Sequence, residues 1–217
     1  PMDLINKYGV DSVRYYLAKE LPLGNDGLFS YERFIERYNN ELANDLGNLV
    51  SRTVSMVEKY FEGNVPHMLT SKTLFDDDLK NVATNAIAKT KENFEKFELQ
   101  DAINETWSLV RRVNKYIDET APWVLAKDEN KKSELEATMA NLIESLRVIA
   151  HLVSPYLVET APKILEAIGL ANDGFNLSNL NYNVGTVTGK VCKIPALFQR
   201  LDVEKELEYF KNKAERP

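Results

Sequence analysis

Four long stretches of the chain repeat apolar residues at helical spacing, and this pattern limits the possible folds more than any other feature. The stretches cover roughly residues 31–61, 75–97, 99–120 and 132–153. In each stretch the apolar residues recur three or four positions apart, which puts them on one face of an α-helix. Nine glycines and eight prolines are few for 217 residues, so little interrupts these helices. Because amphipathic helices bury their apolar faces against one another, the sequence predicts an all-α protein built around a helical bundle.

Two short helices and a loop are expected before the first long helix. Residues 3–8 and 11–20 each carry apolar residues on one side, and Asp11 is placed to cap the second helix. The stretch 21–29 is rich in Gly, Asn and Asp, which predicts a loop. Ser30 is then placed to cap the first long helix.

The C-terminal part of the chain is less regular. Residues 155–168 predict a shorter helix that Pro162 bends or interrupts. Asn, Gly and Ser predominate from about residue 170 to 183, where no helical period is present. Residues 184–192 alternate enough to predict a short extended piece, and Asp202 is placed to cap a last helix. We expect this tail to lie over the bundle as an appendage, without a core of its own.

The overall charge argues against a protein that is held on nucleic acid by bulk electrostatics. The chain has 27 basic and 33 acidic residues, which gives a net charge of −6. An acidic protein gains little nonspecific attraction to phosphate. A local basic surface on an acidic body is still allowed, because binding responds to the local field.

The composition also indicates a compartment. The single cysteine, Cys192, excludes an intrachain disulfide and fits a reducing environment. The sequence contains no signal peptide and no apolar run of membrane length. We therefore expect a cytoplasmic protein with no membrane partner.

Residues for catalysis or metal binding are not grouped anywhere in the sequence. There is no Gly-rich phosphate loop, and Cys192 has no obvious activating partner. His67 and His151 are isolated from other metal-ligating residues, so we interpret them as structural. The acidic run Asp76–Asp78 suits the first turn of a helix, where the helix dipole favours anions, better than a cation site. The residues by themselves indicate a helical binding module.

A polar stripe follows the first long helix. Asn44, Asn48 and Arg52 recur every four residues, so they share a helix face roughly opposite the apolar stripe. Such a stripe can point two amides and a guanidinium at an external partner. Periodicity alone favours a solvated face, however, because every amphipathic helix has polar residues opposite its core.

A second candidate surface closes the third long helix. Asn104, Arg111, Lys115 and Asp118 lie on one side of it, either as a salt-bridged solvent face or as an edge that touches nucleic acid. In the second case Arg111 and Lys115 bind phosphate, and Asp118 either accepts a base amino group or orients one of the two cations. Pro122 ends the helix and holds Trp123 just beyond it, where the ring can meet a base. The residues alone leave open whether Trp123 contacts a ligand or lies in the core.

The segments around these residues resemble one family. Leu42–Arg52 (LANDLGNLVSR) and Asn114–Trp123 (NKYIDETAPW) look like parts of the C-terminal half of bacterial methionyl-tRNA synthetase, a class I aminoacyl-tRNA synthetase. Tyr8–Leu17 resembles the segment that directly follows that family's Lys-Met-Ser-Lys-Ser catalytic loop, and Ser154–Leu157 with Ala161-Pro162 is similar to a helix of related class I synthetases. The resemblance covers nearly the whole chain and keeps its order.

The resemblance implies a fragment of an enzyme that joins methionine to its tRNA, using ATP with Mg²⁺, through a methionyl-adenylate. The catalytic domain and its zinc-bearing insertion would precede Pro1, so the fragment is expected to hold no catalytic residue, cofactor or metal. Residues 1–30 would form a connector touching the inner side of the tRNA, and residues 31–169 the anticodon-binding bundle. Residues 170–217 would form a tail that folds back toward the catalytic domain. The implied partners are the anticodon stem-loop of methionine tRNA and that catalytic domain.

Carried over by position, the resemblance assigns the anticodon contacts to Asn48, Arg52, Pro122 and Trp123. It implies that these residues recognise the sequence C-A-U. Trp123 would stack on the first anticodon base in the pose that Pro122 fixes, while Asn48 bonds base edges and Arg52 binds a base edge or a phosphate. The residues expected to support these contacts are Asn44, Arg111, Lys115 and Asp118.

Two alternatives stay open at this point. Another class I synthetase, such as a cysteine or leucine enzyme, would share the bundle and differ in the anticodon residues, and the element from Asp118 to Trp123 argues against it. A helical scaffold that binds only protein predicts that Trp123 packs into the core and that tRNA does not bind.

Overall fold

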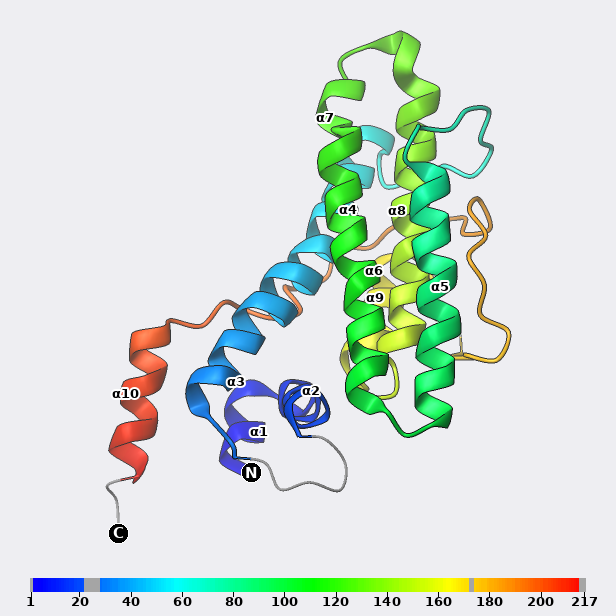
Figure 1. Ribbon diagram of the computed structural model, residues 1–217. Helices are drawn as coiled ribbons and strands as arrows, with labels where there is room; N and C mark the ends of the chain where they lie inside the picture. Colours follow the sequence, from blue (N-terminus) through cyan, green and yellow to red (C-terminus); the bar gives the residue numbers. More distant parts are fainter. Residues whose placement is uncertain (1, 22–27, 172–173, 215–217) are drawn as a thin grey trace.

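The computed structural model describes residues 2–21, 28–171 and 174–214, and in these ranges every regular element is a helix (Figure 1). This confirms the predicted all-α class. The helices follow the chain in the order α1 Met2–Tyr8, α2 Val10–Glu20, α3 Tyr31–Arg37, the π-helix η1 Tyr38–Gly47, α4 Asn48–Phe61, α5 Asp76–Glu95, α6 Leu99–Thr120, α7 Pro122–Leu125, the 3₁₀ turn η2 Glu129–Lys131, α8 Lys132–Val153, α9 Thr160–Ala167 and α10 Val203–Ala214.

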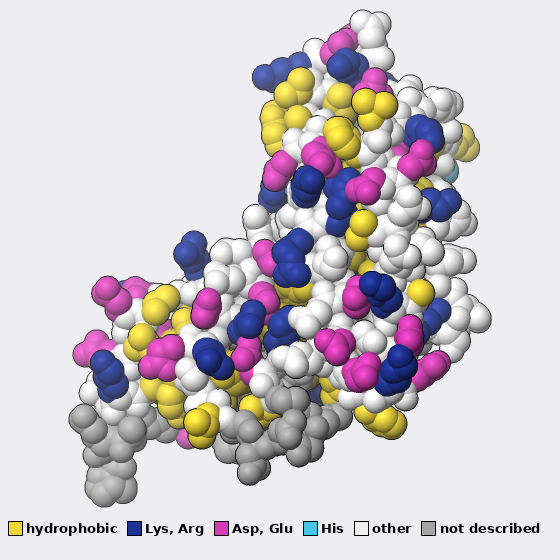
Figure 2. Space-filling view, in the orientation of Figure 1, with side chains coloured by type: hydrophobic (Ala, Val, Ile, Leu, Met, Phe, Trp, Pro, Cys, Tyr) yellow, Lys and Arg dark blue, Asp and Glu magenta, His cyan; other side chains and the backbone are white. Residues whose placement is uncertain are grey.

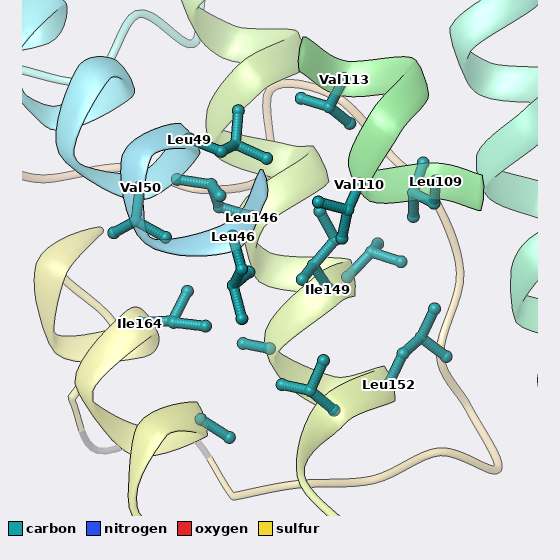
Figure 3. Packing of buried hydrophobic residues seen from close by; sticks show 14 of the residues in the cluster. Leu46, Leu49, Val50, Leu109, Val110, Val113, Leu146, Ile149, Leu152 and Ile164 are labelled. Carbon is teal, nitrogen blue, oxygen red and sulfur yellow. The ribbon is translucent and has the colours of Figure 1, made fainter. Parts of the chain in front are cut away.

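The bundle is formed by α4, α5, α6 and α8, with α9 packed against α8 (Figure 1). Its core follows the apolar stripes of the sequence, and Figure 3 shows Leu46 and Leu49 of the first long helix facing Val110 of α6 and Leu146 and Ile149 of α8. All five side chains are fully buried. Burying one such side chain stabilises a fold by about 1.5–3 kcal/mol, so these stripes fix which helix faces meet.

The first long helix runs from Tyr31 to Phe61 as predicted, but its middle part is a π-helix. The predicted cap is confirmed, because Ser30 Oγ accepts a hydrogen bond from the backbone N–H of Arg33 at 3.2 Å. Within η1, the buried Glu41 accepts a hydrogen bond from Arg37 at 2.8 Å and another from the hydroxyl of Tyr15. A π-helical segment thus carries a buried carboxylate that holds α2 against the long helix.

The connector α1–α2 is tied to the bundle by Asp11. The prediction that Asp11 caps its own helix is wrong, because α2 begins one residue earlier, after Gly9 at φ 84°. Its carboxylate instead accepts hydrogen bonds from the backbone N–H groups of Glu159, at 3.0 Å, and Thr160, at 2.7 Å. Asp11 therefore caps α9, a helix almost 150 positions further along the chain.

The helix predicted for residues 155–168 is shorter than expected. Residues 154–159 form turns, and α9 begins at Thr160. Pro162 is the third residue of α9, inside the first turn, where the N–H that proline lacks has no partner within the helix. The proline therefore neither bends nor interrupts this helix.

The tail follows the bundle and then leaves it. Its extended piece forms a single antiparallel bridge, between Asn64 and Lys190, and no longer strand in the described ranges. The side-chain amide of Asn39 pairs with the backbone of Leu201. Its Nδ2 donates to the carbonyl of Leu201 at 3.0 Å, and its Oδ1 accepts from the N–H of Leu201 at 2.8 Å. The last helix, α10, packs against α3 beside the connector instead of covering the bundle (Figure 1). Asp202 caps it as predicted, accepting from the N–H of Lys205 at 3.3 Å.

Candidate nucleic-acid interface

The polar stripe of the first long helix faces away from the core. Asn44 in η1 and Asn48 in α4 are exposed, whereas Arg52 is partly covered. Leu46, Leu49 and Val50 on the other side of the same helix are buried. The sequence period therefore predicted correctly which side of the helix is open to a partner.

Arg52 reaches across to the third long helix. Its Nη2 donates to Oδ1 of Asp118 at 3.3 Å, with side-chain exposures of 33% and 68%. The contact brings the stripe of α4 beside the polar edge of α6. Since one N–H of the guanidinium is used here, its other donors are left for a further acceptor.

Asn114 makes a second connection between the same helices. Its amide Nδ2 donates to the backbone carbonyl of Asp45 at 2.9 Å and to that of Val110 at 3.2 Å. Asn114 opens the Asn114–Trp123 motif, and no role for it is predicted from the sequence. Its position one helical turn before Asp118 was the sequence feature that could have indicated a role at the same edge of α6. The amide fixes the distance between η1 and α6, and so the relative position of the two polar surfaces.

Trp123 lies on a one-turn helix at the end of α6. Ala121 adopts a left-handed backbone conformation with φ 44°, which ends α6, and Pro122 then starts α7. Pro122 is buried and Trp123 is 43% exposed, whereas the chain's other tryptophan, Trp107, is fully buried. The expected helix end is confirmed, although Trp123 stands on a further helical turn and not in open chain. The exposed ring is contrary to what a protein-only scaffold predicts.

The remaining supporting residues contact neighbours other than those expected. Lys115 pairs with Glu119 at 3.4 Å, one turn along α6. Arg111 is exposed and close enough to Asp45 to oppose the effect of burial, which raises the pKa of that carboxyl. Asp118 contacts Arg52 of another helix, a partner that the spacing within α6 does not indicate.

No group of three or more His, Cys, Asp or Glu side chains in the described ranges is arranged to hold a metal ion. Each histidine instead places its Nδ1 near a backbone carbonyl: His67 near Val65 at 3.2 Å, and His151 near Arg147 at 2.9 Å. In the same ranges, no helix has both the length and the apolar character needed to cross a bilayer.

Exposed amides, a guanidinium and an aromatic ring are groups that suit an unstacked nucleic-acid loop. Amides and guanidinium groups bond base edges and phosphates, and aromatic rings stack on bases. The structure brings Arg52 and Asp118 into contact, with Asn48 one turn before Arg52 and Trp123 shortly after Asp118.

Two family models match the chain. The model described as tRNA synthetases class I (M) matches residues 1–54. The model described as the anticodon binding domain of methionyl tRNA ligase matches residues 67–215.

Curated relatives are similar over almost the whole chain. The methionine–tRNA ligase of Enterococcus faecalis is 47% identical in an alignment 217 positions long, which covers 98% of this chain and 32% of that protein. The methionine–tRNA ligase of Caldanaerobacter subterraneus is 47% identical over 215 residues, which are 99% of this chain and 34% of that protein. The chain thus spans about a third of the length of these relatives.

Solved structures share the fold. The apo form of Mycobacterium tuberculosis methionyl-tRNA synthetase matches with a TM-score of 0.84 and 32% identity, covering 93% of this chain and 41% of that one. The same enzyme in complex with methionyl-adenylate matches with a TM-score of 0.83 and 32% identity, over 92% of this chain and 39% of that one.

Proposed function

The chain belongs to the family of the anticodon-binding domain of methionyl tRNA ligase, and on that premise we propose that it recognises the C-A-U anticodon of methionine tRNA. The observation that carries the proposal is the contact of Arg52 with Asp118, which joins the α4 stripe to the helix that leads to the exposed Trp123. An unstacked anticodon loop offers base faces to an aromatic ring and base edges to polar side chains.

The four proposed contact residues have different roles. Trp123 stacks on the first anticodon base, which contributes about 1–3 kcal/mol to binding, and Pro122 fixes the pose of the ring. Asn48 makes hydrogen bonds to base edges. Arg52 binds a base edge or a phosphate with the donors that Asp118 does not occupy.

The supporting residues act through charge and position. Arg111 and Lys115 add positive charge beside the loop, and Asn44 extends the amide stripe by one turn. Asp118 holds Arg52 in place before RNA binds, since the two side chains are already in contact.

The proposal extends to the whole protein of which this chain is a part. Its relatives are named methionine–tRNA ligase, and one solved relative is in complex with methionyl-adenylate. We infer an enzyme of protein synthesis in the cytoplasm that attaches methionine to tRNA using ATP with Mg²⁺, with its catalytic domain on the N-terminal side. Residues 1–30 would be its connector, 31–169 its anticodon-binding unit and 170–217 its tail.

Titration of the chain with a C-A-U anticodon stem-loop, at two salt concentrations, tests the proposal. A second stem-loop is altered only at the first anticodon base. We expect weak binding that depends on C, and a loss of about five- to 150-fold in Trp123→Ala from the missing stack. The matched control is Phe97→Ala, which removes a 74% exposed aromatic ring from the turn between α5 and α6.

The alternatives predict other results. A different class I synthetase unit would prefer another anticodon, and a protein-only scaffold would bind neither stem-loop. Equal binding of both stem-loops, together with an unchanged affinity in Trp123→Ala, would refute anticodon recognition.

A further inference from the structure

A hollow of about 460 Å³ lies beside the segment that follows α7. Figure 1 shows α7 at one end of the bundle. The walls of the hollow come from the C-terminal end of α4, the segment after α7 and the start of α8. The polar residues that line it are Lys59, Tyr60, Lys127, Asp128, Glu129 and Lys132.

The hollow continues the proposed anticodon interface. Lys59 follows Arg52 by seven residues, or two helical turns, so it extends the polar stripe of α4 along the same face. On the other wall, Lys127 follows Trp123 by four residues, or about 6 Å along a helix. Backbone hydrogen bonds from Ala126 to Pro122, at 2.9 Å, and from Lys127 to Val124, at 3.1 Å, continue α7 into a turn that ends at Lys127. Both halves of the interface therefore lead to the hollow.

Positive charge predominates in the hollow. Lys59, Lys127 and Lys132 are exposed, and the ion pairs formed within the described ranges include none of them. Of the two carboxylates, Asp128 accepts from the backbone and side chain of Asn130, at 3.0 and 3.1 Å. Glu129 is exposed. Figure 2 shows Lys or Arg, Asp or Glu and hydrophobic side chains next to one another at this end of the molecule.

An aromatic ring accompanies these cations. Tyr60 is partly exposed, and the ammonium of Lys59 lies 5.4 Å from the centroid of its ring. A ring with a hydroxyl can pack on a ribose and donate a hydrogen bond to it or to a phosphate. Ammonium groups on flexible stems bind phosphate as point charges.

We propose that this hollow binds the sugar–phosphate backbone of the nucleotides next to the base on Trp123. The inference rests on the proposed anticodon recognition and deepens it by assigning a separate backbone subsite. Lys59, Lys127 and Lys132 bind phosphate oxygens, and Tyr60 packs on the adjoining ribose. Phosphate contacts fix the register of a strand and carry no sequence information, so the subsite raises affinity equally for every anticodon. It also explains how a chain of net charge −6 holds RNA, since the favourable field is local.

The double variant Lys59→Gln/Lys127→Gln tests the subsite from both walls, in the full chain and with the two stem-loops described above. Each lost contact should weaken binding about two- to fivefold, equally for both stem-loops. The dependence of log K on log salt should become shallower by about 1.4, from two phosphates at about 0.7 each. The control Lys80→Gln/Lys163→Gln makes the same charge change at exposed positions on α5 and α9.

A second measurement locates the contact on the RNA. Neutral methylphosphonate linkages are placed one at a time around the first anticodon base. The linkage bound in the hollow should weaken binding of the unsubstituted protein more than it weakens binding of the double lysine variant, which keeps only Lys132 there.

The outcomes separate the two proposals. If Trp123→Ala abolishes the preference for C while the double lysine variant binds like its control, the backbone subsite is refuted and anticodon recognition stands. The backbone subsite is also refuted if every neutral linkage has the same effect on binding of the unsubstituted protein and of the double lysine variant. If the unsubstituted protein binds neither stem-loop, both proposals fail.

Discussion

Nη2 of Arg52 lies 3.3 Å from Oδ1 of Asp118, and this contact joins two helices through residues 66 positions apart. Both side chains remain partly exposed, at 33% and 68%. Exposed ion pairs stabilise proteins by only about 0–1 kcal/mol, so the pair is easily exchanged for a contact with RNA. The ion pair therefore holds the guanidinium of Arg52 in position but is weak enough for RNA to displace it.

Asp118→Asn should tighten RNA binding and reduce its selectivity. The substitution removes a negative charge that repels phosphate and releases Arg52 for any acceptor on the RNA. We expect the free energy of unfolding to change by less than about 1 kcal/mol. Affinities for the cognate and first-base-altered stem-loops, measured side by side, should converge. The control Glu95→Gln removes one exposed charge near the end of α5. Weaker cognate binding in Asp118→Asn would contradict this prediction, and would mean that positioning of Arg52 by the carboxylate, or a contact of the carboxylate with the RNA, outweighs the lost repulsion.

Asn114→Ala should weaken RNA binding although we propose no RNA contact for Asn114. Its amide connects α6 to the carbonyl of Asp45 in η1 at 2.9 Å. Losing this hydrogen bond should lower the free energy of unfolding by about 1–2 kcal/mol, measured by urea denaturation. It should also misplace the two polar surfaces relative to each other.

Asn141→Ala separates that effect from lost stability. Asn141 is a buried amide of α8 that donates to the carbonyl of Ala137 at 2.9 Å. Its replacement should destabilise the fold by a similar amount and leave the affinity of the folded protein for RNA unchanged. If both variants bind RNA equally well, Asn114 has no positioning role.

Asp45→Asn should stabilise the protein at neutral pH. Burial raises the pKa of Asp45 above 3.8 in the folded state, although Arg111 opposes the shift. The folded state therefore binds more protons than the unfolded state above pH 3.8, and stability falls as the pH rises through the folded pKa. Removing the carboxyl removes this penalty.

Urea denaturation at several pH values from about 3.5 to 7 measures the effect. The gain in Asp45→Asn should appear above the folded pKa and vanish at the acid end. Asp77→Asn gives the opposite sign, because a hydrogen bond from Lys72 lowers the pKa of Asp77. A neutral-pH loss of stability in Asp45→Asn would show that its carboxylate is stabilising.

The long helices and their packed faces could be predicted because the controlling pattern is local. Each apolar stripe lies within one stretch of sequence, and the caps at Ser30 and Asp202 act within three residues. The cap that Asp11 provides for α9 could not be predicted, since its acceptor and donors lie almost 150 positions apart. The π-helix was not predicted either, and its buried Glu41 accepts a hydrogen bond from Tyr15 of another helix, which a local pattern does not contain.

The candidate site, like the fold, could be predicted only where the controlling pattern lies within one helix. Helical spacing predicted the outward direction of Asn48 and Arg52, and the Pro122 pattern predicted the end of α6. Neither pattern contains the contact between Arg52 and Asp118, because spacing within one helix says nothing about which other helix lies beside it. Only the family resemblance connected the α4 stripe with Trp123.

Pro122→Ala should loosen the pose of Trp123. Pro122 is buried at the first position of α7, where its fixed φ suits a helix and its missing N–H is not needed. A helix of four residues is not stable by itself, so α7 depends on this proline and on the turn at Ala121. With alanine at position 122, the ring samples several orientations, and binding must select one of them. We expect weaker binding and a smaller preference for C, with little change in global stability.

The mobility of the Trp123 ring can be measured because the chain's two tryptophans lie in different surroundings. In protein labelled with 5-fluorotryptophan, ¹⁹F NMR should give separate signals for the exposed Trp123 and the buried Trp107. Pro122→Ala should shift or broaden only the Trp123 signal, and the anticodon stem-loop should sharpen it again. An unchanged Trp123 signal together with an unchanged preference for C would mean that the turn at Ala121 positions the ring without help from the proline. Ala121→Gly would then be the substitution that mobilises Trp123, since glycine tolerates φ 44° without restricting it.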